Sequence, residues 1–112
     1  MKGTSLGEFE ELCLLVVGIL HGDAYGVAIK EELELRSGRK ATISTIHSTL
    51  IRLEKKGFLS SKMGGATDNR GGRAKRIFEV TAFGKKAINE ARELRNTLWQ
   101  DIPKILWQGG DS

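Results

Sequence analysis

Residues 42–56 carry hydroxyl groups and positive charges at spacings that one helix brings to the same side. An α-helix turns each residue by about 100° relative to the one before it. On that wheel one side of the segment is aliphatic: Ile43, Ile46, Leu50 and Leu53. The other side bears short hydroxyl residues first and cations after them: Ser44, Thr45, Ser48, Arg52, Lys55 and Lys56. Since hydroxyls donate and accept hydrogen bonds and cations pair with anions, the pattern predicts a buried face and a polyanion-binding face.

This outer face is typical of a helix that reads DNA. An α-helix fits the major groove of B-DNA, and its N-terminal residues reach the base edges. Short Ser and Thr side chains allow a close approach, Arg52 can pair with a guanine or a phosphate, and Lys55 and Lys56 suit phosphates. The alternative is an ordinary amphipathic surface helix, but its outer side usually mixes Glu with Lys. His47 lies between the two faces, and we interpret it as a packing residue.

A second set of cations lies in a glycine-rich segment between two predicted strands, 58–63 and 76–81. Residues 64–75 form the expected tip of this hairpin, and glycines let its backbone approach a ligand closely. The cations of the tip suit phosphates and narrow minor grooves: Arg70, Arg73 and Lys75. A nucleotide-binding loop is excluded because the GxxxxGK[ST] pattern is absent and no helix follows the glycines directly. A solvated hairpin without a function is the remaining alternative.

The distribution of charge agrees with a polyanion partner. Residues 36–86 contain thirteen Lys and Arg against three acids, a net charge of +10. The rest of the chain contains five bases against eleven acids, a net charge of −6. A basic block within an acidic remainder is the electrostatic pattern expected of a nucleic-acid-binding surface.

The elements that position these residues follow from hydrophobic spacing and from turn signals. An apolar helix over 12–20 is followed by a second helix, which Asp23 caps, and then by the helix over 42–56, which Thr42 caps. The hairpin comes next, and a last helix starts near Ala82 and is kinked or ended by Pro103. This order predicts a mainly α fold with a small β-hairpin (α+β), a winged helix-turn-helix. Residues 1–81 are the expected DNA-binding domain, and residues 82–108 an added C-terminal dimerisation helix.

Two apolar surfaces predict a homodimer. The first helix is apolar on nearly every side, and the last helix has an apolar stripe, so both need more cover than one small chain supplies. Trp99 lies on or near the same surface, and aromatic residues are enriched at interfaces. The predicted dimer interface comprises Leu14, Val17, Ile88, Ala91, Leu94, Leu98, Trp99 and Ile102.

Several other classes of protein are not expected. One cysteine, Cys13, and two histidines make a zinc site improbable and exclude an internal disulfide. We find no nucleophile with a base, no paired carboxylates and no cofactor motif, so we expect neither an enzyme nor a cofactor. No run of apolar residues is long enough for a membrane span, and the start of the chain turns acidic at Glu8, which predicts a cytoplasmic protein. The competing binding function is a winged-helix module for a protein or RNA partner.

The sequence resembles the PadR family of bacterial transcriptional regulators in three segments, residues 23–29, 50–59 and 72–84. The resemblance implies a winged helix-turn-helix that dimerises through its C-terminal helix. It also implies binding to double-stranded DNA at a palindrome-like operator, usually as a repressor. Carried over to this chain, the recognition positions are Thr42, Ser44, Thr45, Ser48 and Arg52, and the wing positions are Arg73 and Lys75.

Two features qualify the resemblance. The family often has Tyr where His47 stands, so no role of that tyrosine is carried over. The short C-terminal helix resembles the compact branch of the family, with a single dimerising helix. Some members bind flat aromatic compounds between the dimer helices, which makes Trp99 the candidate residue for stacking on a small aromatic effector.

Overall fold

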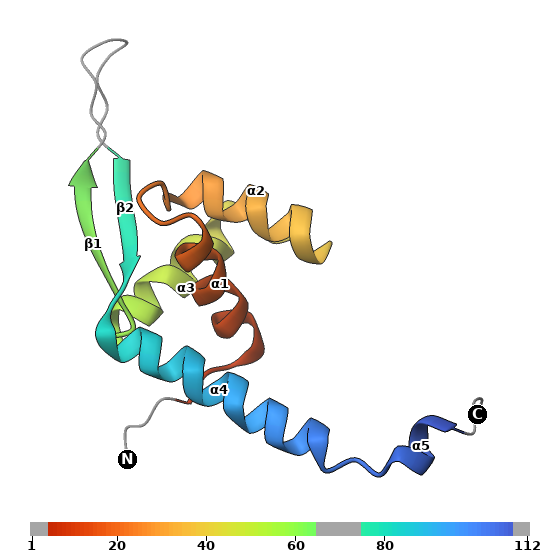
Figure 1. The fold of residues 1–112 in the computed structure, drawn as a ribbon. Helices are drawn as coiled ribbons and strands as arrows, with labels where there is room; N and C mark the ends of the chain where they lie inside the picture. Colours follow the sequence, from red (N-terminus) through yellow and green to blue (C-terminus); the bar gives the residue numbers. More distant parts are fainter. Residues whose placement is uncertain (1–4, 65–74, 109–112) are drawn as a thin grey trace.

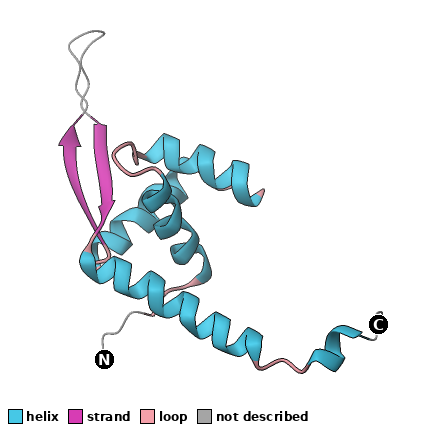
Figure 2. Cartoon of the chain, in the orientation of Figure 1, coloured by secondary structure: helices cyan, strands magenta, loops and turns pink. Residues whose placement is uncertain are grey.

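A computed structural model of the chain describes residues 5–64 and 75–108. Within these residues three helices precede an antiparallel hairpin, and two helices follow it (Figures 1 and 2). The elements are α1 (Glu8–Ile19), α2 (Gly26–Ser37), α3 (Ile43–Lys55), β1 (Leu59–Gly64), β2 (Lys75–Val80), α4 (Ala82–Gln100) and α5 (Lys104–Gln108). The predicted class, a winged helix with a small hairpin, is therefore confirmed.

The core forms where α1 is enclosed by α2, α3, β2 and α4 (Figure 1). Its fully buried side chains come from these elements and from Phe58 in the turn before β1; the others are Leu14, Val17, Ile29, Leu33, Ile46, Leu50, Leu53, Phe78 and Ala87. Ile43 was predicted to join them but is 37% exposed, since it opens the first turn of α3. Thr49 is buried instead, and its hydroxyl donates to the carbonyl of Thr45 at 2.9 Å, which satisfies the polar group.

The turn before α2 differs from the prediction. Asp23 does not cap this helix, because α2 begins at Gly26 with Tyr25 in the N-cap position. The intervening Ala24 is buried, and its carbonyl accepts a hydrogen bond from the Phe78 N–H of β2 at 2.9 Å. This bond ties the start of α2 to the hairpin.

The ring of His47 packs against the first turn of α2. A Cβ atom placed on Gly26 would lie 2.8 Å from Cε1 of that ring, so the contact depends on glycine at this position. His47 was interpreted as a partly buried packing residue; its ring makes this contact, but the residue as a whole is exposed.

The start of α4 is bound to the turn between α3 and β1. Thr81 caps α4 by accepting a hydrogen bond from the Gly84 N–H at 2.9 Å, and its own hydroxyl donates to the Gly57 carbonyl at 2.7 Å. The rings of Phe58 and Phe83 stack with centroids 5.0 Å apart. The direction in which α4 leaves the winged domain is therefore fixed locally.

The C-terminal region is not one helix. The last helix was expected to be kinked or ended by Pro103, and α4 does end before it, at Gln100. A separate helix, α5, starts at Lys104 directly after the proline. Ile102 consequently lies in the connecting turn rather than on the helical stripe. Figure 1 shows α4 and α5 extending beyond the packed body. The radius of gyration is 17.2 Å, whereas a compact domain of this length has about 13 Å.

The structure also corrects the predicted interface on α1. Leu14 and Val17 are 0% and 1% exposed within the single chain, so they have no surface left for a partner. The large apolar side chains of α1 that are exposed are Leu15 and Ile19, while Phe9 and Leu12 are half-buried. An all-apolar helix gives no periodicity from which its outer side can be chosen, which explains the error.

Replacing Gly84 by Ala should destabilise the fold. The added Cβ would overlap the backbone oxygen of Phe58 and lie 2.9 Å from a methyl group of Val80, and a backbone atom cannot move aside cheaply. We expect the free energy of unfolding to fall by about 1–3 kcal/mol, measured by urea denaturation. Gly18→Ala is the matched control, because its Cβ would meet its nearest neighbour at 3.9 Å. Equal effects of the two substitutions would contradict this account of the α4 junction.

Candidate nucleic-acid interface

The N-terminal half of α3 presents its hydroxyl residues outward, as predicted. Thr42, Ser44, Thr45 and Ser48 are all exposed. Thr42 caps the helix by accepting a hydrogen bond from the Thr45 N–H at 3.1 Å, and its hydroxyl lies 3.1 Å from that of Thr45. The Ser48 hydroxyl donates to the Ser44 carbonyl at 3.0 Å. These groups are held in place by the helix itself while remaining open to a ligand.

The C-terminal half of α3 carries the cations, and two of them share one carboxylate from α1. Glu10 accepts a hydrogen bond from Nε of Arg52 at 2.9 Å and from Nζ of Lys56 at 2.9 and 3.1 Å. The side chain of Glu10 is 9% exposed, whereas those of Arg52 and Lys56 are 51% and 41% exposed. The two cations therefore reach the surface from a buried anchor.

Glu10 is held in its ionised form. Burial by itself would raise the pKa of this carboxyl group. Hydrogen bonds from the Gly7 N–H, Lys56 and Arg52, together with the positive charge of Lys56, outweigh that effect and lower the pKa below its ordinary value. The hydrogen bond from the Gly7 N–H to Glu10, 2.9 Å long, is also the one that caps the first turn of α1.

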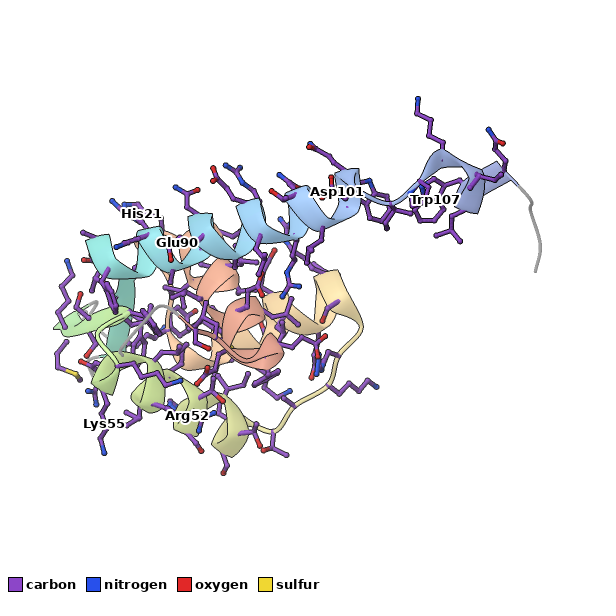
Figure 3. The ribbon with its side chains drawn as sticks, turned by 90° about the horizontal axis from the view of Figure 1, so that it is seen from below. His21, Arg52, Lys55, Glu90, Asp101 and Trp107 are labelled. Carbon is purple, nitrogen blue, oxygen red and sulfur yellow. The ribbon has the colours of Figure 1, made fainter. Side chains whose placement is uncertain are left out.

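Lys55 extends from the same end of α3 and is exposed, with no ion pair among the described residues. Figure 3 shows Arg52 and Lys55 on the side of the molecule away from α4. The candidate DNA-binding face and the projecting C-terminal helix thus lie on different sides of the winged domain.

The base of the wing is tied to the helices at two points. Nζ of Lys75 lies 4.1 Å from the ring centroid of Tyr25, a cation–π contact. Arg76 donates to Glu54 of α3 and to Ser61 of β1, each at 3.0 Å, and the Ser61 hydroxyl donates to Glu54 at 2.8 Å. The orientation of the hairpin relative to α3 is therefore set by a polar network. The predicted wing positions Arg70 and Arg73 lie outside the described residues.

Sequence reasoning missed the acids and the aromatic residue that hold these cations. Glu10 was not singled out from the sequence, and Glu54 entered only as one of the three acids of residues 36–86. Glu10 is the third residue of α1, where a Glu side chain can accept from the N-cap N–H, and this could have marked it as fixed in position although Gly7 has no capping side chain of its own. No signal in the sequence links it to Arg52, 42 residues later.

Other kinds of site find no support in the described part of the chain. No group of three or more His, Cys, Asp or Glu side chains there could hold a metal ion. Burial raises the pKa of the Cys13 thiol to about 12, so it is not a nucleophile at neutral pH. Among the described residues, none of the helices has the length and apolar character needed to cross a bilayer.

Comparison with known families identifies the relationship. Residues 14–90, more than half of the chain, match the family described as the transcriptional regulator PadR-like family. The chain belongs to the PadR-like family of transcriptional regulators. This confirms the resemblance noted from the three segments, and it agrees with the expectation that the chain is not an enzyme. No curated protein matches the sequence significantly.

Solved structures of PadR proteins have the same fold. A PadR family transcriptional regulator from Eggerthella lenta is 25% identical, with a TM-score of 0.64 over 90% of this chain and 88% of that one. A PadR family transcription regulator from Clostridium difficile is 28% identical, with a TM-score of 0.59 over 87% and 95%. Bacillus subtilis PadR in complex with operator DNA is 22% identical, with a TM-score of 0.55 over 70% and 45%, a similarity of fold.

The lowered pKa of Glu10 predicts a pH-dependent contribution to stability. Its ionised form stabilises the fold at neutral pH, and this contribution is lost as the pH falls through the folded-state pKa. Glu10→Gln keeps the size of the side chain and an oxygen for the Gly7 N–H. Because both cations are half exposed, we expect a loss of about 1 kcal/mol in the free energy of unfolding at neutral pH. Urea denaturation should show this deficit shrinking in acid, and a deficit that does not change with pH would contradict the assignment.

Proposed function

We propose that this protein is a sequence-specific DNA-binding transcriptional regulator, acting as a repressor. It binds a palindrome-like operator as a homodimer through helix 42–56 and wing 64–75. The observation that carries the proposal is the rotation of α3, which buries Ile46, Leu50 and Leu53 and turns an acid-poor face of hydroxyls and cations outward. Family membership supports regulation of transcription, and the operator complex of B. subtilis PadR shows a chain of this fold on DNA.

The proposed roles follow from the position of each residue on that face. The hydroxyls near the N-terminus of α3 approach base edges: Thr42, Ser44, Thr45 and Ser48. Arg52 pairs with a guanine, since its guanidinium presents a fork of donors. Lys55, Lys56 and Lys75 bind phosphates and set the register of the protein on the duplex. Arg70 and Arg73, in the segment between β1 and β2, are proposed to contact the backbone or the minor groove.

The proposed dimer covers the apolar surface of α4. Leu94, Leu98 and Trp99 are 60%, 59% and 64% exposed, and such a run of large apolar side chains is unfavourable in water. Ile88 and Ala91 continue the stripe toward the winged domain and are half-buried. Beyond Pro103, the exposed Ile105, Leu106 and Trp107 extend it. A two-fold axis through this surface would place two α3 helices at half-sites about 34–36 Å apart.

We propose that residues 1–81 bind DNA, that residues 82–108 form the dimer, and that the protein acts in the cytoplasm.

Trp99 is the candidate residue for binding a small aromatic effector. The ring of Trp99 lies 5.2 Å from that of Trp107, tilted by 33°, so a flat ligand would enter or displace this pair. The alternative function is a winged-helix module that binds protein or RNA.

The DNA-binding proposal is tested with two duplexes. The selected duplex is the sequence that the parent protein enriches most from random-sequence DNA, and the scrambled duplex has the same base composition. We expect Arg52→Ala and Arg73→Ala each to weaken binding to the selected duplex by about 1–3 kcal/mol without unfolding the protein. Gel shifts with a salt titration measure both affinities.

Arg36→Ala is the control for this experiment. Arg36 is exposed at the end of α2, pairs with Glu32 and is not among the proposed DNA-binding residues. If both test variants bind like the parent, the assignment of the reading helix and wing is wrong. If the parent does not prefer the selected duplex, the alternative of a protein or RNA partner is favoured.

Leu98→Asp should break the dimer and abolish binding to the selected duplex. A charge placed in an apolar interface is not compensated, and the loss of two-fold contacts removes one half-site. Light scattering coupled to size exclusion measures the mass, and Asn96→Asp adds the same charge nearby as the control. A monomeric Leu98→Asp protein that still binds tightly would refute the two-fold arrangement.

A further inference from the structure

Glu10 is a buried carboxylate with more partners than its place in α1 requires. The capping of α1 uses one oxygen, Oε1, which accepts from the Gly7 N–H at 2.9 Å. The remaining contacts go to the last turns of α3: Oε2 accepts from Arg52 at 2.9 Å, and both oxygens lie within 3.1 Å of Nζ of Lys56. The residue as a whole is 7% exposed. The carboxylate of Glu10 is therefore a fixed negative charge that binds Arg52 and Lys56, two cations of the proposed DNA-binding face.

The contact between Glu10 and Arg52 uses Nε and leaves the two terminal nitrogens of the guanidinium open to a ligand. Arginine has five N–H donors in a rigid plane, and Glu10 engages the one on Nε. The N–H groups of the two terminal nitrogens have no partner in the described part of the chain, and the side chain is 51% exposed. Those nitrogens form the fork that pairs with O6 and N7 of guanine or with a phosphate.

We propose that Glu10 is a positioning residue for DNA recognition, which holds Arg52 by its Nε so that the terminal fork meets a guanine edge. The inference rests on the proposed function. Holding the side chain beforehand reduces the rotamer freedom that binding must remove, as in other preorganised sites. Glu10 also offsets part of the positive charge of Arg52 and Lys56, which weakens attraction to phosphates of every sequence alike. The positioning of Arg52 is therefore the effect that raises the preference for the operator over other DNA.

A positioning role and a purely structural role make different predictions. If Glu10 only stabilised α1, its loss would lower the fraction of folded protein and weaken binding to every duplex alike. If it positions Arg52, its loss lowers affinity for the selected duplex and leaves or raises affinity for the scrambled one, since a negative charge has gone. The ratio of the two affinities is therefore the quantity to measure.

The experiment compares Glu10→Gln with Glu8→Gln. Glu8 lies in the same turn of α1, is 74% exposed and pairs with Arg39 at 3.4 Å rather than with α3, so it controls for the lost charge. We expect Glu10→Gln to reduce the ratio of selected to scrambled binding by about tenfold, within the range of coupled neighbours. Glu8→Gln should leave the ratio unchanged. In an Arg52→Ala background, Glu10→Gln should have no further effect on it.

The outcomes separate this inference from the proposed function. Equal ratios for Glu10→Gln and Glu8→Gln, with Arg52→Ala reducing the ratio, would overturn the inference and leave the DNA-binding proposal standing. A reduced ratio for Glu10→Gln that persists in the Arg52→Ala background would also overturn it. A parent protein without preference for the selected duplex would overturn both.

A second measurement covers the case in which Glu10→Gln does not fold. In the parent protein, the Nε–H of Arg52 should give an NMR signal with slow solvent exchange, identified by its absence in Arg52→Ala. The signal should stay protected when the selected duplex is added, because the hydrogen bond from Nε of Arg52 to Glu10 is kept. An Nε–H that exchanges freely, or that loses its protection on binding DNA, would overturn the inference.

Discussion

The packing of α3 against α1 is the constraint on which the rest of the structure depends. Ile46, Leu50 and Leu53 are all 0% exposed, and each buried aliphatic side chain contributes about 1.5–3 kcal/mol. Turning α3 by one residue would expose part of this set and bury hydroxyls or a cation, which costs several kcal/mol more than exposed ion pairs could return. The rotation of the outer face is thus decided by the core, and only the fine placement of its cations is left to polar contacts.

The parts of the fold that the sequence predicted are those with a local cause. The period of the aliphatic residues located α3 and its inner side, Thr42 marked its start, and the glycines marked the hairpin. Pro103 gave the end of the last helix for an equally local reason, although the separate α5 was not expected. The family resemblance rests on these same segments, so it reinforced the local predictions. The roles of the DNA-binding residues remain a proposal, because they depend on contacts with a partner and not on the packing within this chain.

The parts that could not be predicted depend on contacts between distant residues. Glu10 meets Arg52 and Lys56 only because α1 crosses α3 at that point, and neither helix alone indicates the crossing. The Asp23 side chain is of a type that caps helices well, but the Ala24 carbonyl accepts a hydrogen bond from β2, and α2 begins only at Gly26. On α1 nearly every side is apolar, so the choice between Leu14 and Leu15 as the outward residue requires the tertiary structure.

These contacts pair some of the cations of the basic block, residues 36–86, with carboxylates. Its net charge of +10 already subtracts Glu54 and Glu79, which pair with Arg76 and Lys62. It does not include Glu10, which lies outside the block and holds Arg52 and Lys56. Attraction to phosphates is therefore weaker than the count of Lys and Arg suggests, because a cation paired with a carboxylate releases fewer counterions from DNA. This loss is the same for every DNA sequence, so it does not by itself favour one site over another. Under the proposed function, Glu10 and Glu54 would contribute to discrimination by fixing where Arg52 and Arg76 point.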